Sequence, residues 1–277
     1  MKKYLLVLLS FVLLMSSSSV FGQNKSEKIE IKSQEVKGVT YSMEVLLPGS
    51  YDSTKKYPII YITDWWYGSR LVPGLLGVLN FVQKIEPVII VGIEIKSSSG
   101  LADWTLDRGR DLTPSNVPAW DSLSKLPAGT SGGAKHFLSF IKKELIPTVE
   151  KKYTSDTNNR GYVGYSFGGL FGTYILLNEP QLFKKYLIGS PSLWWDDQLL
   201  AKELKKMKAE NLKSIKAVFL SVEEEGTQLQ SYSQIREQLL KKKPDSMQLE
   251  TVIILDEDHM TALPSTIIKG LKFLYGI

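Results

Sequence analysis

The sequence predicts an α/β fold in which a mostly parallel, twisted sheet carries helices on both faces and begins with an antiparallel hairpin. Two stretches of alternating polarity, residues 28–35 and 40–47, open this pattern. Two continuous apolar runs, residues 57–63 and 87–95, are typical of strands buried on both faces. Strand and helix patterns then alternate to the C-terminus, which favours an open sheet over a sandwich or a bundle.

The first 22 residues predict a secretory signal peptide. Lys2 and Lys3 precede an apolar run from Tyr4 to Met15, and a polar stretch leads to a cleavage site after Gly22. An uncleaved anchor is the alternative, but the run is too short to span a bilayer comfortably. We therefore expect an exported protein, periplasmic or secreted, whose residues 23–277 form one domain without a membrane span.

Composition excludes several classes of protein. The chain has 277 residues, 43% of them hydrophobic, and no cysteine. Disulfides, thiolate metal sites and cysteine nucleophiles are therefore excluded. The formal charge of +5 falls to +3 without Lys2 and Lys3 (5 − 2 = 3). The remaining basic residues are scattered apart from the run 241–243, which indicates a solvated helix end and not a nucleic-acid surface. The oligomeric state stays open.

The elements after the hairpin follow in order. A polar turn at residues 52–56 precedes the first apolar run, and residues 71–84 favour a helix before the second. Residues 96–130 hold three prolines and no clear period, so we expect a long loop or a small cap there. The later expected segments are a helix at 131–153 kinked by Pro147, a strand at 160–165, a helix at 167–177, strands at 183–188, 217–222 and 251–255, and helices at 199–207, 232–240 and 265–275.

The segment from Gly164 to Gly168 matches the G-x-S-x-G pattern of a nucleophile elbow. A strand enters this segment and a helix leaves it, which is the frame that such an elbow requires. Ser166 is therefore the predicted nucleophile, and the N–H of Phe167 at the helix start is a predicted oxyanion donor. The alternative is a glycine-rich packing turn with an idle serine.

A serine nucleophile needs a base, and the chain has two histidines. His259 follows the last expected strand, where the order nucleophile, acid, histidine of α/β-hydrolases places the base. His136 is expected on a helix surface. Glu223, Glu224 and Glu225 follow the strand 217–222, and we favour Glu225 as the acid. The acidic residues 256–258 and a bare serine–histidine dyad stay open as alternatives.

With these residues in view, the sequence resembles the putative-esterase family of α/β-hydrolases, which includes esterase D-like enzymes and siderophore esterases related to enterochelin esterase. The resemblance extends from about Val39 to the C-terminus. It rests on five ordered blocks, namely Arg108-Gly-Arg-Asp-Leu-Thr-Pro, the helix that starts at Gly132, the elbow Gly164–Gly172, Ser190-Pro-Ser-Leu-Trp-Trp, and His259. Two positions depart from the family pattern. Trp65 and Glu223 stand where relatives often carry glycine.

The resemblance implies a serine esterase that acts on an acyl or polyester substrate without metal or organic cofactor. Candidate substrates are a siderophore-like trilactone, an acylated glycan or a small ester. The N–H of Trp65 would be the second oxyanion donor. Arg108 and Arg110 are candidate substrate contacts, although Arg110 could equally form a local ion pair with Asp111, and Trp66 could wall the pocket. Acyl transfer to a sugar hydroxyl and a non-catalytic binding protein are the alternative functions.

Overall fold

The computed structural model describes residues 25–95, 100–224 and 228–277. The expected signal peptide, residues 1–22, lies outside this range. Within these described residues, eight strands form one sheet in the order β1-β2-β4-β3-β5-β6-β7-β8. Their bounds are β1 Ser26–Lys32, β2 Thr40–Leu46, β3 Tyr57–Ile62, β4 Ile89–Ile95, β5 Ser155–Tyr165, β6 Lys185–Gly189, β7 Ala217–Glu223 and β8 Gln248–Ile254.

The sheet combines an antiparallel start with a parallel body, as the sequence predicts. β1 pairs with β2 and β2 with β4 in antiparallel register. All later pairs are parallel, from β4 and β3 to β7 and β8. The carboxyl ends of the parallel strands therefore meet at one edge, which is where open α/β sheets place their sites. The predicted hairpin and mostly parallel sheet are confirmed.

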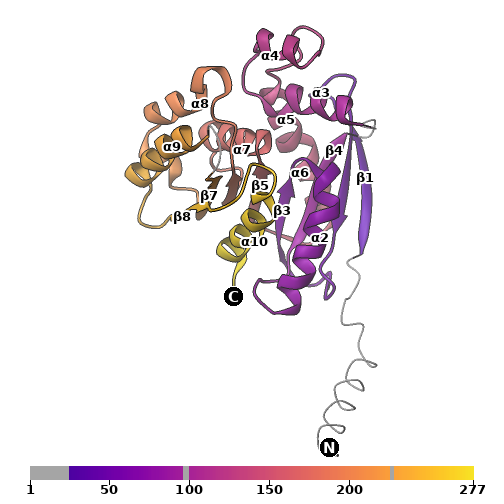
Figure 1. Cartoon of the computed structure of the whole chain (residues 1–277). Coiled ribbons are helices and arrows are strands. Elements are labelled where there is room, and N and C mark those ends of the chain that lie inside the picture. The colour runs from indigo at the N-terminus through magenta and orange to yellow at the C-terminus, as the bar shows by residue number, and fades with distance from the viewer. Residues whose placement is uncertain (1–24, 96–99, 225–227) are drawn as a thin grey trace, which may run out of the picture.

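Helices cover both faces of the sheet (Figure 1). On one face lie α2 (Trp65–Phe81) and α10 (Ala262–Tyr275), whose buried side chains form one apolar cluster with the sheet. On the other face a larger apolar cluster joins the sheet to further helices. These are α5 Ala134–Phe140, the π-helical turn Ile141–Leu145, α6 Ile146–Lys152, α7 Phe167–Asn178, α8 Trp195–Lys206 and α9 Leu229–Lys242.

Two expectations about the first half of the chain are wrong in part. Helix α2 begins at Trp65, six residues before the expected start, directly after β3. The segment expected as a loop or cap contains two helices, α3 (Leu101–Leu112) and α4 (Pro118–Leu123). Helix α3 buries one charged residue, Asp111, beside Gly109 and Leu112, so its buried face is not a plain apolar stripe. The kink expected at Pro147 appears as the π-helical turn just before it.

Candidate active site

Ser166 lies on a sharp turn between β5 and α7. Its backbone has φ 60° and ψ −118°, a strained conformation for a residue with a side chain. The turn leaves no room on either side: a Cβ on Gly164 would lie 2.2 Å from the Gly168 carbonyl oxygen. This strand–turn–helix geometry is that of a nucleophile elbow, and it leaves the Ser166 side chain partly exposed.

The two predicted oxyanion donors come from neighbouring helix starts. Trp65 is the first residue of α2 and Phe167 the first residue of α7. These helices follow β3 and β5, which pair in parallel. The first amides of a helix have no partner within it. Both N–H groups thus lie at the same edge of the sheet as Ser166.

The side chain of Trp65 turns away from this edge. Its indole is buried, donates to Glu44 Oε2 at 2.8 Å, and occupies the space above Gly92 of β4. A Cβ on Gly92 would lie only 1.9 Å from the indole ring. A tryptophan is therefore accommodated at the position where relatives often carry glycine, because β4 has no side chain there.

His259 lies in the loop between β8 and α10 and packs beside the elbow. Its ring centre is 5.2 Å from that of Tyr165, the residue before the nucleophile, and Tyr165 donates its hydroxyl to the His259 carbonyl oxygen at 2.5 Å. Ser166 Oγ lies 3.4 Å from Ser192 Oγ. Within the described part of the chain the serine hydroxyl and the imidazole form no hydrogen bond with each other. Such contacts are often long without substrate.

The carboxylate that meets His259 is Glu223. Its Oε1 lies 2.9 Å from His259 Nδ1, and its side chain is 2% exposed at the end of β7. Burial alone would raise the pKa of Glu223, but hydrogen bonding, chiefly from His259, holds this pKa below its ordinary value. Glu225, the acid favoured from the sequence, lies outside the described residues, and among the described carboxylates Glu223 is the one in contact with His259 Nδ1.

A second side chain reaches the same ring nitrogen. The amide of Gln228, the residue before α9, lies 3.1 Å from His259 Nδ1. Sequence reasoning did not identify Gln228, since glutamine carries no charge and belongs to no motif here. We refer to Ser166, Glu223, Gln228 and His259 together as the imidazole site.

Two other candidates, Asp258 and His136, lie away from the Nδ1 contact of His259. Asp258 accepts from the N–H groups of Met260 and Thr261, at 2.7 and 2.9 Å, at the start of α10. His136 is exposed on α5, as expected. Among the described residues, no group of three or more His, Asp or Glu is placed to hold a metal ion, and no helix is long and apolar enough to cross a membrane.

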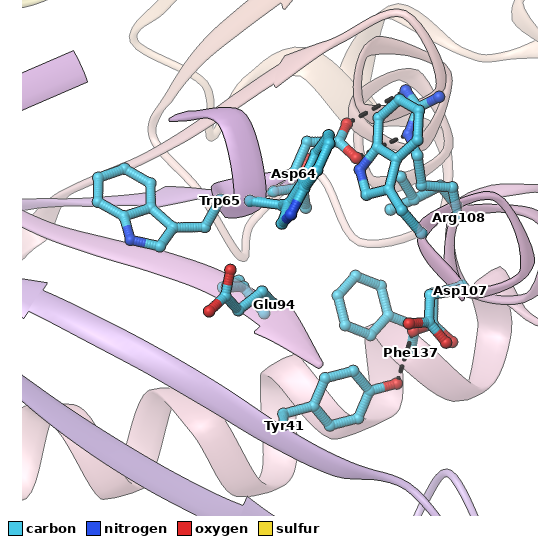
Figure 2. Close-up of a pocket in the computed structure, with 13 residues that line it drawn as sticks. Tyr41, Asp64, Trp65, Glu94, Asp107, Arg108 and Phe137 are labelled. Atoms are coloured by element: carbon cyan, nitrogen blue, oxygen red, sulfur yellow. Dashed lines mark hydrogen bonds and ion pairs between the residues drawn. The ribbon is translucent and has the colours of Figure 1, made fainter. Parts of the chain in front are cut away.

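An open cavity, here called the cap cavity, lies between α2, α3 and the sheet. Figure 2 shows its aromatic and acidic walls, with the Arg108 side chain extended toward Asp64. Neither Ser166 nor His259 lines it. It adjoins the elbow through Arg108, whose guanidinium carbon lies 5.0 Å from the centre of the Phe167 ring.

Both candidate arginines are already paired. Arg108 donates to the two carboxylate oxygens of Asp64, at 2.7 and 3.2 Å. Arg110 donates to both oxygens of Asp111, at 2.8 Å each, and to Asp107 at 3.2 Å. The local ion pair, one of the two readings left open for Arg110, is therefore the one observed. Burial raises the pKa of both Asp64 and Asp111, and their arginines oppose that rise.

Trp66 stands at the rim of the cap cavity and is 36% exposed. Its ring centre lies 5.7 Å from that of Trp104, and the Arg108 guanidinium stacks on Trp104 at 4.4 Å. Trp194, whose ring centre lies 6.1 Å from that of Phe167, is 43% exposed. A partly exposed aromatic ring therefore lies next to the first residue after the nucleophile, and another stands at the rim of the cap cavity.

Comparison with known proteins matches this chain to esterases. The family model described as "Putative esterase" matches residues 33–243. The ferri-bacillibactin esterase BesA of Bacillus subtilis strain 168 is 24% identical over 267 residues, which cover 89% of this chain and 88% of the relative. The siderophore enterobactin esterase of Emericella nidulans is 32% identical over 124 residues, 43% of this chain and 40% of the relative.

Solved structures agree with the fold. The BES protein from Bacillus cereus superposes with a TM-score of 0.76 at 26% identity, over 91% of this chain and 96% of that protein. An IroE-like serine hydrolase from Shewanella oneidensis gives a TM-score of 0.70 at 25% identity, over 91% and 80% respectively. The α/β-hydrolase fold expected from the sequence is thereby confirmed.

Proposed function

Because the chain belongs to the putative-esterase family and is thus an esterase-type hydrolase, we propose that it cleaves carboxylic esters through an acyl-enzyme formed on Ser166. His259 is the base in this proposal, and Glu223 is its carboxylate partner. The observation that carries the proposal is the 2.9 Å contact of Glu223 with His259 Nδ1, beside a serine on a strained elbow. A buried carboxylate on Nδ1 leaves Nε2 as the basic nitrogen.

The reaction proceeds in two halves. Ser166 Oγ attacks the ester carbonyl carbon while His259 Nε2 takes its proton, and the carbonyl electrons move onto oxygen. The N–H groups of Phe167 and Trp65 stabilise this oxyanion. When the intermediate collapses, the leaving alcohol takes the proton from His259 and the acyl group stays on Ser166. Water, deprotonated by the same imidazole, then releases the acid and restores the serine.

We further propose that the substrate is a siderophore ester with aromatic arms. Three relatives of this chain are named as esterases of ferri-bacillibactin, enterobactin and apo-salmochelin. In this chain Trp66 exposes aromatic surface at the rim of the cap cavity and Trp194 exposes it beside Phe167. Arg108 and Arg110 are neutralised by aspartates. Aromatic contact is therefore the binding chemistry that supports this proposal.

The catalytic part of the proposal is tested with a fluorophosphonate probe. We expect the wild-type protein to be labelled on one serine, Ser166→Ala to lose labelling, and Ser122→Ala, at an exposed serine on α4, to label normally. Turnover in Ser166→Ala should fall by a factor on the order of 10⁴ or more. Labelling that persists in Ser166→Ala would contradict the proposal.

The substrate is tested with a panel of esters. We expect hydrolysis of a catecholate trilactone, with and without ferric iron, to exceed that of p-nitrophenyl acetate and of feruloyl esters. Preference for feruloyl or acetyl esters would replace the siderophore by an acylated glycan or a small ester. Product analysis with added trehalose separates hydrolysis from acyl transfer. Export is likewise a proposal, and recovery of a mature protein that begins at Gln23 would support it.

A further inference from the structure

We infer that Gln228 is a positioning residue that fixes the tautomer of His259 and ties its ring to the segment beside the nucleophile. This inference rests on the proposed role of His259 as base. Three contacts of the Gln228 side chain carry it. One reaches His259 Nδ1 at 3.1 Å, and the others reach the carbonyl oxygens of Ser190 and Pro191 at 3.1 and 2.6 Å.

The chemistry of these contacts leaves one orientation for the amide. The two backbone carbonyl oxygens can only accept hydrogen bonds, so the amide nitrogen of Gln228 must face them. The amide oxygen then faces His259 Nδ1. Because an amide oxygen only accepts, Nδ1 must carry the hydrogen. In the neutral ring Nε2 is then the basic nitrogen, which is the form that a base for Ser166 needs.

Glu223 points to the same tautomer, but the two partners differ in one respect. A carboxyl group can become protonated and then donate a hydrogen, whereas a glutamine amide does not titrate. The amide of Gln228 also cannot turn round without placing its oxygen against two carbonyl oxygens. Nδ1–H is therefore shared between one acceptor that depends on pH and one that does not.

The position of Gln228 adds a mechanical role. Ser190 and Pro191 directly precede Ser192, whose N–H donates to the Ser166 carbonyl oxygen at 3.2 Å. A single buried side chain thus spans from the imidazole to the segment that contacts the nucleophile. Gln228 uses none of its side chain to cap α9, although it stands at the helix start. The side chain is therefore fully engaged in this bridge.

Nuclear magnetic resonance of ¹⁵N-labelled histidine tests the tautomer without substrate. His136→Gln, at the exposed second histidine, leaves His259 as the single imidazole in the background used. Above the titration of the ring we expect the Nδ1–H form in the parent and in Glu223→Ala, where Gln228 alone holds the ring. Combining Glu223→Ala with Gln228→Met should populate the Nε2–H form. The inference fails if this double variant keeps Nδ1–H, or if Glu223→Ala alone loses it.

Inactivation rates with the fluorophosphonate provide the functional readout. Gln228→Met should slow inactivation about tenfold, as expected for one lost hydrogen bond of ordinary strength in the transition state. The same change should cost more in the Glu223→Ala background. Gln230→Met, at an exposed glutamine two residues further on, is the matched control and should react normally. An unchanged rate in Gln228→Met would overturn the positioning role.

The two proposals can fail separately. If Ser166 is not labelled at all, the proposed function fails while the tautomer measurement remains readable. If Ser166 is labelled but the tautomer ignores Gln228, only this inference fails. Should Gln228→Met not fold, as judged by its circular dichroism and melting, Gln228→Leu takes its place with the same expected results.

Discussion

Two regions at the same edge of the sheet hold buried carboxylates, and they use them differently. In the cap cavity, Asp64 is paired through both oxygens with Arg108. In the imidazole site, Glu223 holds one nitrogen of His259 through one oxygen. The guanidinium is bound in a fork that satisfies the pair, whereas the histidine is 32% exposed and keeps a second ring nitrogen for other partners.

Of these two pairs at one edge of the sheet, the arginine–aspartate pair stabilises the fold and the histidine–glutamate pair is suited to proton transfer. An arginine stays protonated at any ordinary pH, so a bidentate arginine–aspartate pair is a fixed dipole. An imidazole held at one nitrogen can gain or lose a proton at the other. Substitutions that remove a charge in the cap cavity should therefore lower stability more than activity. Substitutions in the imidazole site should lower activity more than stability.

The strongest test of this division is a comparison of the two histidines. We expect His259→Gln to lower kcat about a thousandfold or more with little change in KM, because the base for Ser166 is lost. His136→Gln should leave kcat within twofold. Steady-state ester hydrolysis measures both. A His259→Gln variant with nearly normal kcat would move the base elsewhere.

The second test removes Arg108. In Arg108→Met the carboxylate of Asp64, 2% exposed, loses its cation, and we expect unfolding to become easier by about 3–5 kcal/mol. Adding Asp64→Asn should restore much of this loss. Lys142→Met, at the exposed pair with Glu179, should cost about 1 kcal/mol or less. Urea unfolding measures all three proteins. If Arg108→Met changed only KM, Arg108 would be a substrate ligand and the contrast between the regions would break.

A third test concerns Trp65, which connects the two regions. Gly92→Ala places a Cβ in the space of the indole, and we expect about 1–3 kcal/mol of destabilisation with lower kcat, since the Trp65 amide moves with its ring. Gly77→Ala meets open space on helix α2 and should stabilise by about 0.5–1 kcal/mol. Melting temperature and kcat together measure the outcome. A normal kcat in a destabilised Gly92→Ala would show that the Trp65 amide does not stabilise the oxyanion.

The smallest expected effect is a pH dependence from Glu223. Because the folded state lowers the pKa of this carboxyl, its contribution to stability is present above the unfolded value of about 4.3. The contribution is lost as pH falls through the lower folded pKa. We expect the melting temperature of the wild type to drop more steeply in this acidic range than that of Glu223→Gln. Parallel curves would assign the acid sensitivity to other carboxylates.

Sequence reasoning located the elbow and the histidine, and it favoured Glu225 as the acid while leaving the neighbouring glutamates, the acidic residues 256–258 and a bare dyad open. The three glutamates differ by one step each, and β7 continues to Glu223, one residue beyond the expected end of the strand. The expected end of the strand therefore fell one residue before the carboxylate that contacts His259.

The same limit explains why α3 and Gln228 were missed. Helix α3 buries Asp111, which contacts Arg110 and Tyr41, so a charged residue stands on the inner face of this amphipathic helix. Gln228 acquires its role only because β6, β8 and the start of α9 bring Ser190, Pro191 and His259 within reach of one amide. No sequence pattern within a single segment predicts such a tertiary contact.

The sequence by itself determined the alternation of strands and helices and the serine turn, because both depend on local periodicity or on glycine spacing. It also placed the histidine, through the chain order of α/β-hydrolases. The tertiary structure decided which carboxylate meets the imidazole, that both arginines are neutralised, and that a glutamine shares the imidazole hydrogen. Most of those contacts join residues 31 to 44 positions apart, so they depend on strand register and on burial. The pair of Arg110 with Asp111 joins neighbours, whose side chains are oriented by packing.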